Sequence, residues 1–132
     1  MIFVDTSFWV ALALVPDRMH TRAAELFSRH AQTPLATSNH VCGETWTFVR
    51  RRFGHRTAVA VVDRLQRTAR LQIVRVEGDD ERSAWEWLRG HDEGEYSFVD
   101  ATSFALMSRL AIHEALSFDG DFAAAGFVEL RP

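Results

Sequence analysis

Short runs of β-branched and aromatic residues alternate with longer segments of helical periodicity along the whole chain. The short runs predict strands at 2–4, 35–37, 71–76, 115–118 and 127–130. The segments between them predict helices at 6–15, 21–31, 41–52, 56–69, 81–90 and 98–110. Strands that alternate with helices of this length indicate βαβ crossovers. The pattern therefore predicts an α/β fold with a mostly parallel sheet covered on both faces.

Length and composition agree with one ordinary globular domain over residues 1–132. The chain is 47% hydrophobic, with seven glycines and three prolines, and no linker or repeat interrupts it. No apolar run approaches the roughly 18 residues of a membrane span, so we expect no membrane association. The amino end lacks the basic region of a secretory signal, and Cys42 has no second cysteine to pair with. We therefore expect a cytoplasmic protein.

The positive charge is unusual because all 15 basic side chains are arginines. The absence of lysine excludes P-loop nucleotide binding and Schiff-base enzymes, both of which need an amine. The formal net charge is −3, but the charge is unevenly spread. Residues 40–75 hold eight arginines against two acids, whereas residues 77–100 hold nine acids against two arginines. A site for a polyanion is therefore expected in the first stretch.

Acidic residues stand where two of the predicted strands end. Asp5 follows the strand at 2–4, and Asp119 follows the run at 115–118. Ligands of open parallel sheets bind beyond the carboxyl ends of the strands. The alternative interpretation is local: Asp5 caps the next helix, and Asp119 with Gly120 forms an ordinary turn.

Two further acids lie near the starts of predicted helices. Glu44 falls at the border of an apolar stripe that includes Val41 and Phe48, and Asp100 stands at capping-box spacing after Ser97. Each acid alone is explained by capping or by a surface position. Crossover helices begin at the carboxyl edge of the sheet, however, so all four acids are expected at one edge. That convergence favours a single site.

Carboxylates a few ångströms apart repel one another by several kcal/mol at an effective dielectric near 20, so such a cluster needs a cation. The chain offers no lysine, and no histidine or cysteine stands at ligand spacing among these acids. Oxygen ligands alone select Mg²⁺ or Mn²⁺ over Zn²⁺. Because Mg²⁺ retains several water ligands, the expected site suits a phosphate substrate.

Four segments together resemble the PIN-domain ribonucleases, and in particular the VapC toxins of VapBC toxin-antitoxin pairs. In chain order they read MIFVDTSFWVALAL, SNHVCGETW, SFVDATSFALM and ALSFDGDF. The resemblance covers essentially the whole chain. It implies a three-layer, Rossmann-like PIN domain whose five-stranded sheet has the order 3-2-1-4-5. It also implies a Mg²⁺-dependent endoribonuclease that uses a metal-activated water and leaves 5′-phosphate ends.

The resemblance also assigns roles to residues of this chain. It implies five catalytic acids, which are Asp5, Glu44, Asp100, Asp119 and Asp121. Of these, Asp5, Asp100 and Asp119 are the implied metal ligands. Thr6 and Ser117 are the implied supporting hydroxyls. No catalytic acid of the family pattern is missing, so the pattern does not indicate an inactive homologue.

A run of arginines follows Glu44 and is the expected contact for RNA phosphates, which guanidinium groups bind through two hydrogen bonds. Its members are Arg50, Arg51, Arg52 and Arg56. In the alternative interpretation they only complement a helix dipole before Gly54. The segment 38–56 resembles the VapC toxins that cut the sarcin-ricin loop of large-subunit ribosomal RNA, whereas other relatives cut tRNA. The family further implies a homodimer and a VapB-type antitoxin partner.

Other classes with acidic sites fit less well. A haloacid-dehalogenase-type phosphatase needs an aspartate two residues after the first, where this chain has Ser7, and it also needs a lysine. A response-regulator receiver, which binds Mg²⁺ and phosphate without being an enzyme, uses a lysine as well. A PIN module that only binds RNA is a third alternative, and the intact set of acids argues against it.

Overall fold

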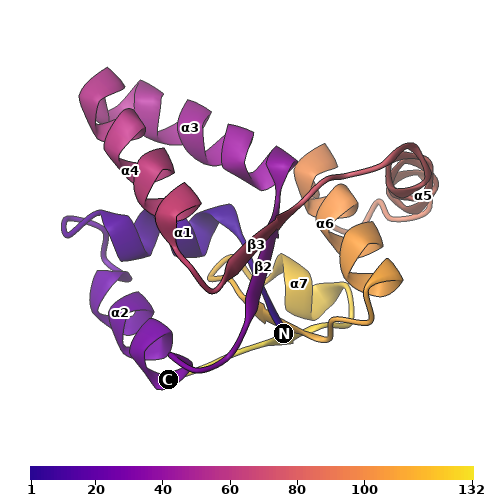
Figure 1. The fold of residues 1–132 in the computed structure, drawn as a ribbon. Helices are drawn as coiled ribbons and strands as arrows, with labels where there is room; N and C mark the ends of the chain where they lie inside the picture. Colours follow the sequence, from indigo (N-terminus) through magenta and orange to yellow (C-terminus); the bar gives the residue numbers. More distant parts are fainter.

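The structure, a computed structural model, describes residues 1–132 and contains a five-stranded sheet and seven helices (Figure 1). In chain order the elements are β1 Ile2–Val4, α1 Thr6–Ala13, α2 His20–Arg29, β2 Leu35–Ser38, α3 Asn39–Phe53, α4 His55–Arg67, β3 Leu71–Val74, α5 Gly78–Arg89, α6 Phe98–Arg109, β4 Glu114–Leu116, α7 Asp121–Ala124 and β5 Val128–Glu129. The predicted alternation of strands and helices is confirmed. No helix is long and apolar enough to cross a membrane.

All strands are parallel and lie in the order β3-β2-β1-β4-β5, as the family resemblance implied. The central strand β1 pairs with β2 on one side and with β4 on the other, so Phe3 lies between Ala36 and Ala115. The winding direction therefore reverses at β1. Val4 is in register with Leu116, and this pairing brings the carboxyl ends of β1 and β4 side by side.

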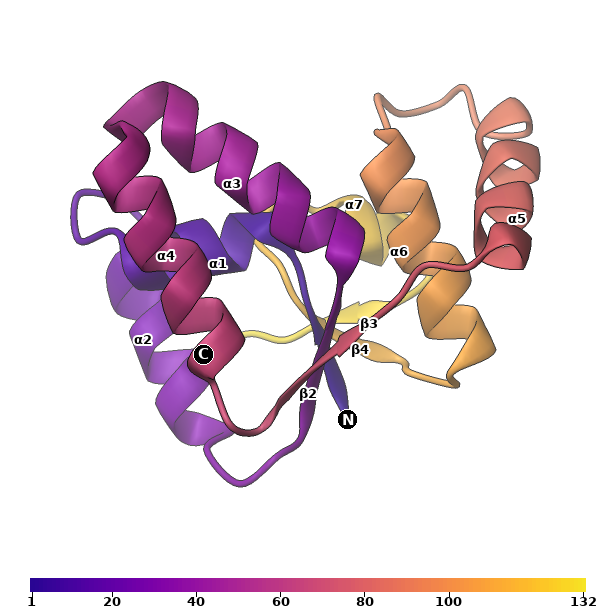
Figure 2. The ribbon, with the colours of Figure 1, turned by 45° about the horizontal axis from the view of Figure 1, so that its top comes forward.

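The helices form two groups on either side of the sheet. Figure 2 shows α3 and α4 as a pair on one side and α5 and α6 as a pair on the other. Figure 1 places α3 along the carboxyl ends of the strands, where it contacts both α1 and α6. The starts of α1, α3 and α6 therefore meet at one edge of the sheet, which is where the sequence places its acids.

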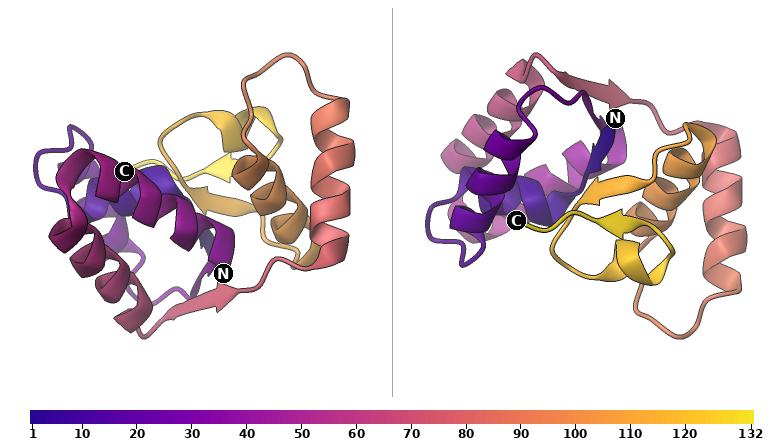
Figure 3. Two further views of the ribbon diagram at one scale, coloured as in Figure 1. Left: turned by 90° about the horizontal axis from the view of Figure 1, so that it is seen from above. Right: turned by 90° about the horizontal axis from the view of Figure 1, so that it is seen from below.

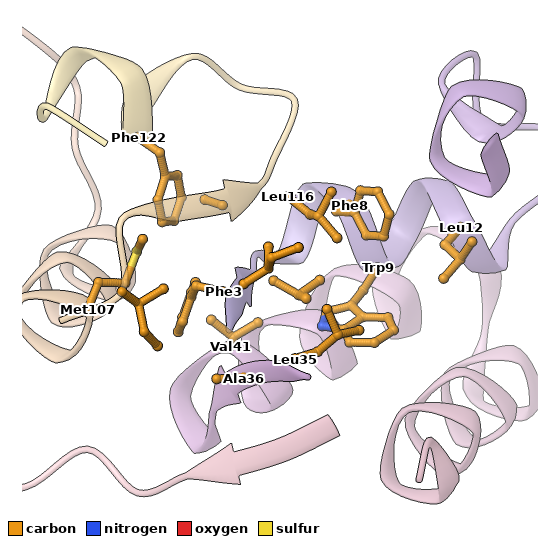
Figure 4. Packing of buried hydrophobic residues seen from close by; sticks show 14 of the residues in the cluster. Phe3, Phe8, Trp9, Leu12, Leu35, Ala36, Val41, Met107, Leu116 and Phe122 are labelled. Atoms are coloured by element: carbon orange, nitrogen blue, oxygen red, sulfur yellow. The ribbon is translucent and has the colours of Figure 1, made fainter. Parts of the chain in front are cut away.

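The core is built around β1, whose three residues are fully buried. A central parallel strand is covered on both faces and is therefore apolar throughout. Figure 4 shows Phe3 beside Met107 and Phe122 on one side of the sheet, with Trp9 and Leu35 on the other. The same burial fixes the residues that follow β1, because Asp5 continues directly from it.

Several predicted boundaries are wrong by a few residues, and two of the errors concern the site. The strand predicted at 115–118 ends at Leu116, because the Phe118 amide donates to Ser7 Oγ rather than to a neighbouring strand. The short helix α7 was not predicted, since four residues are too few for a periodic pattern. It begins after Gly120, whose φ of 81° is a left-handed conformation that glycine adopts readily.

Candidate active site

Asp5 is the most deeply buried acid at the carboxyl edge of the sheet, with only 2% of its surface exposed. It is the N-cap of α1, and its Oδ2 accepts a hydrogen bond from the Ser7 amide at 3.5 Å. The same oxygen accepts from Ser7 Oγ at 3.1 Å and from Ser117 Oγ at 3.2 Å. The capping interpretation is therefore confirmed for Asp5, and it coexists with a position among the other acids.

Glu44 reaches the same edge from α3. Its Oε1 accepts a hydrogen bond from Thr6 Oγ1 at 2.6 Å, and the side chain is half-buried. The two residues are 38 positions apart and meet because α3 passes beside the start of α1. Thr6, which follows Asp5 directly, thus ties a carboxylate of one helix to the residue that caps another.

Asp100 takes part in the predicted capping box at the start of α6. The Ser97 amide donates to Asp100 Oδ2 at 2.9 Å, and the Asp100 amide donates to Ser97 Oγ at 3.0 Å. These bonds fix the carboxylate at the helix start but engage only one of its two oxygens. The other oxygen accepts no hydrogen bond from the protein, so it is free to bind a cation.

Three acids come close enough to share a metal ion. One carboxylate oxygen from each of Asp100, Asp119 and Asp121 lies within 4.8 Å of the others. Asp119 Oδ1 accepts from the Asp121 amide at 3.0 Å and lies 3.1 Å from Ser117 Oγ, so the single hydroxyl proton of Ser117 is shared between Asp5 and Asp119. The turn at Gly120 therefore brings Asp121 back beside Asp119.

No arginine or histidine forms an ion pair with these acids. Burial raises the pKa of Asp5 to about 8, and repulsion from Asp119 adds to this effect. Burial also raises the pKa of Asp121 to about 6, and it raises the pKa of both Glu44 and Asp100. The ionised form of each of these acids is therefore less stable in the protein than in water. No positively charged side chain compensates the negative charge of the cluster.

The donor set fits a hard divalent cation. It consists only of carboxylate oxygens, and neither histidine nor cysteine belongs to the group. The ligands expected from the family were Asp5, Asp100 and Asp119. The geometry brings Asp121 into range of Asp100 and Asp119, while Asp5 Oδ2 accepts from the hydroxyls of Ser7 and Ser117.

Comparison with known proteins gives the family. A model of the PIN domain matches residues 2–128. The chain belongs to the PIN-domain family. Two strains of Mycobacterium tuberculosis, CDC 1551 / Oshkosh and ATCC 25618 / H37Rv, each have a relative named 23S rRNA-specific endonuclease VapC20. Each relative is 56% identical over 132 residues, which cover 100% of this chain and 99% of the relative.

A solved structure agrees closely with this PIN domain. The crystal structure of VapC20 from Mycobacterium tuberculosis, described as a sarcin-ricin loop cleaving toxin, is 53% identical in sequence. The match covers 100% of both chains, with a TM-score of 0.94. The sheet order and the arrangement of helices are therefore those of a PIN domain with an experimentally solved relative.

The PIN domain contains one site residue that the sequence analysis did not assign. Ser7 Oγ lies 3.1 Å from Asp5 Oδ2 and 3.2 Å from Ser117 Oγ, and it accepts from the Phe118 amide at 3.0 Å. Ser7 thus joins the segment after β1 to the segment after β4. The sequence feature that could have indicated this role is a hydroxyl residue in the first helical turn after an acid that ends a strand.

The predicted arginines do not all approach the acids. Arg51 and Arg52 line a hollow of about 340 Å³ together with Glu44, and the Arg52 guanidinium carbon lies 4.7 Å from the centre of the Phe48 ring. Arg50 and Arg56 are exposed but do not line this hollow. Within the predicted set, only the middle pair borders the cluster.

Proposed function

We propose that this PIN domain is the endoribonuclease toxin of a toxin-antitoxin pair and that it cuts the sarcin-ricin loop of large-subunit ribosomal RNA. The observation that carries the proposal is the set of carboxylates at the carboxyl edge of the sheet, which no protein cation balances. Full-length similarity to proteins named 23S rRNA-specific endonuclease supports the choice of RNA.

In this proposal Asp100, Asp119 and Asp121 hold Mg²⁺ or Mn²⁺. Asp5 is either a further ligand or an acid that positions the other three. A divalent ion in such a site supplies a water of lowered pKa for attack on phosphorus and neutralises charge on the phosphoryl oxygens. The hydroxyls of Ser7 and Ser117 hold Asp5 in one orientation. Thr6 holds Glu44 at the border of the site.

Arg51 and Arg52 are proposed to bind backbone phosphates of the RNA. Their hollow adjoins Glu44, so a phosphate held there lies next to the acids. Arg52 stacks on Phe48 and therefore has a defined position before RNA binds. The proposed partners are RNA and a VapB-type antitoxin, the proposed assembly is a homodimer, and the proposed location is the cytoplasm.

The test offers purified protein a synthetic sarcin-ricin loop hairpin and, in parallel, a transcribed tRNA, each with Mg²⁺ or with chelator. We expect one cut in the hairpin, a 5′-phosphate on the new end, and no cut in chelator. Cutting of the tRNA alone would contradict the proposed substrate. Cutting that persists in chelator would contradict the metal site.

Cleavage in cells gives a second, independent measurement. Brief expression followed by mapping of new 5′ ends across total RNA should give one dominant site in the large ribosomal RNA. If binding of RNA is measurable but no new ends appear in cells or in vitro, the protein is a PIN module that only binds RNA.

A further inference from the structure

A second hollow opens beside the acid cluster, on a side that the predicted arginines do not reach. It measures about 600 Å³ and includes Ser7, Asp119, Arg18 and Arg22 in its lining. Arg18 belongs to the connection between α1 and α2, and Arg22 lies in the first turn of α2. Figure 3 shows this connection at the end of the molecule opposite α5, and the lining of the hollow brings its arginines together with Asp119, which follows β4. One hollow thus meets the cluster at Glu44 and the other meets it at Asp119.

Neither arginine of the second hollow is engaged by the protein. Both are exposed, and neither forms an ion pair or a side-chain hydrogen bond. Asp17 also lines the hollow, but its Oδ1 accepts from the Met19 amide at 2.8 Å and therefore serves the turn. The two guanidinium groups remain available to an external anion.

The stability of α2 does not explain these arginines. The first turn of the helix contains no acid, and its N-cap makes no side-chain hydrogen bond. A positive charge at a helix N-terminus opposes the helix dipole, so arginine near this end is locally unfavourable. Residues that break a local rule without a structural gain are typical of binding sites.

We infer that Arg18 and Arg22 bind a backbone phosphate of the RNA on the Asp119 side of the acid cluster, while Arg51 and Arg52 bind one on the Glu44 side. This inference rests on the proposed function, because it needs RNA as the substrate. Arg18 and Arg22 are then positioning residues. Together with Arg51 and Arg52, they hold the RNA strand on both sides of the acids. Guanidinium groups suit this role because each can donate two hydrogen bonds to one phosphate.

The test is the double variant Arg18→Ala/Arg22→Ala, assayed with a fluorescently labelled sarcin-ricin loop hairpin. We expect anisotropy to show binding weakened roughly tenfold or more, and the slope of log affinity against log salt to become shallower by about one to two units. With Mg²⁺, KM should rise by a similar factor while kcat changes little. A role in folding alone would leave the salt slope unchanged.

The matched control is Arg29→Ala. Arg29 lies in the last turn of the same helix, lines neither hollow and pairs with Glu25 at 3.2 Å, so its loss removes one positive charge without touching the site. We expect wild-type binding and a wild-type salt slope. The variant Arg18→Lys/Arg22→Lys keeps both charges and should restore the slope while recovering only part of the affinity. It also keeps the test decisive if the alanine variant folds poorly.

Unchanged affinity and unchanged salt slope in the double alanine variant would overturn the inference. A wild-type protein that binds the hairpin through these arginines but never cuts RNA would overturn the proposed function instead. Binding and cleavage are separate readouts, so the two failures are distinguishable.

Discussion

Two aspartates are buried to nearly the same extent but in opposite surroundings. Asp5 is 2% exposed at the carboxyl edge of the sheet, and Asp80 is 3% exposed near the start of α5. Asp80 receives a guanidinium fork, with Arg109 Nε at 2.8 Å from Oδ1 and Nη2 at 2.9 Å from Oδ2. The Glu77 amide also donates to it, at 2.9 Å. The hydrogen bonds from Arg109 hold the pKa of Asp80 below its ordinary value.

Asp5 receives only neutral donors, and its nearest charges are other acids, so its pKa is raised to about 8. Burial therefore does not distinguish a functional acid from a structural one in this fold. The partner does: an acid with its own arginine joins two helices, whereas an acid among acids is suited to a cation from solution.

Substitution of the two acids by asparagine should separate these roles most strongly in activity. Asp5→Asn and Asp100→Asn should lower cleavage of the hairpin by roughly a hundredfold or more, since even outer-shell groups of metal sites contribute 10- to 100-fold. Asp80→Asn is the matched control, because it makes the same change at an equally buried acid. Cleavage per folded molecule should stay at the wild-type level. If Asp80→Asn lost as much activity as Asp5→Asn, the two aspartates would not differ in role as proposed.

The same variants should change stability in opposite directions, as measured by urea unfolding in chelator. Asp80→Asn removes a charged hydrogen-bond acceptor from Arg109 and should lower the free energy of unfolding by about 2 kcal/mol. Asp5→Asn removes an acid whose raised pKa makes it take up a proton on folding at neutral pH, so it should raise the free energy of unfolding. If Asp5→Asn is destabilising in chelator and remains so with Mg²⁺, the serine hydrogen bonds outweigh the repulsion among the acids.

The pH dependence of stability should differ in sign between the two regions. In chelator, folded Asp5 holds a proton between about pH 4 and pH 8 that the unfolded chain has released, so stability should fall as the pH rises through this range. Asp5→Asn should flatten this slope. The contribution of Asp80 is fully present above its unfolded pKa and is lost as the pH falls through its lowered folded pKa, so Asp80→Asn should lack that acidic loss. Thermal unfolding from pH 3 to pH 9 measures both.

The smallest expected effects come from single arginines on α3. Arg51→Ala or Arg52→Ala should weaken hairpin binding modestly and reduce the salt slope by about one unit for each lost phosphate contact. Arg50→Ala is the comparison within the same helical turn, since Arg50 lies outside the hollow beside Glu44. Equal effects of all three variants would mean that the arginine run acts through its total charge and not through the hollow.

The sequence was sufficient for the features that depend on local pattern. The apolar run at β1 predicted a strand, and the spacing of Ser97 and Asp100 predicted the capping box that the structure contains. Alternation of strands and helices predicted which edge carries the acids. These inferences use only neighbours in the chain, and for that reason they hold.

Other features depend on distances that only the folded chain defines. The pairing of Asp80 with Arg109 joins residues 29 positions apart, and nothing in either segment indicates it. The approach of Asp121 to Asp100 depends on the left-handed turn at Gly120, which also starts the unpredicted helix α7. The separation of Arg50 from Arg51 and Arg52 depends on which side of α3 meets the hollow.

Glu44, Arg51 and Arg52 share the single helix α3, and α3 contacts α1 on one side and α6 on the other. A small rigid-body tilt of this helix would therefore displace an acid and the two arginines proposed to bind RNA in one movement. A molecule that binds against α3 and shifts it would inhibit the protein without contacting any proposed metal ligand. RNA binding and cleavage would be lost together.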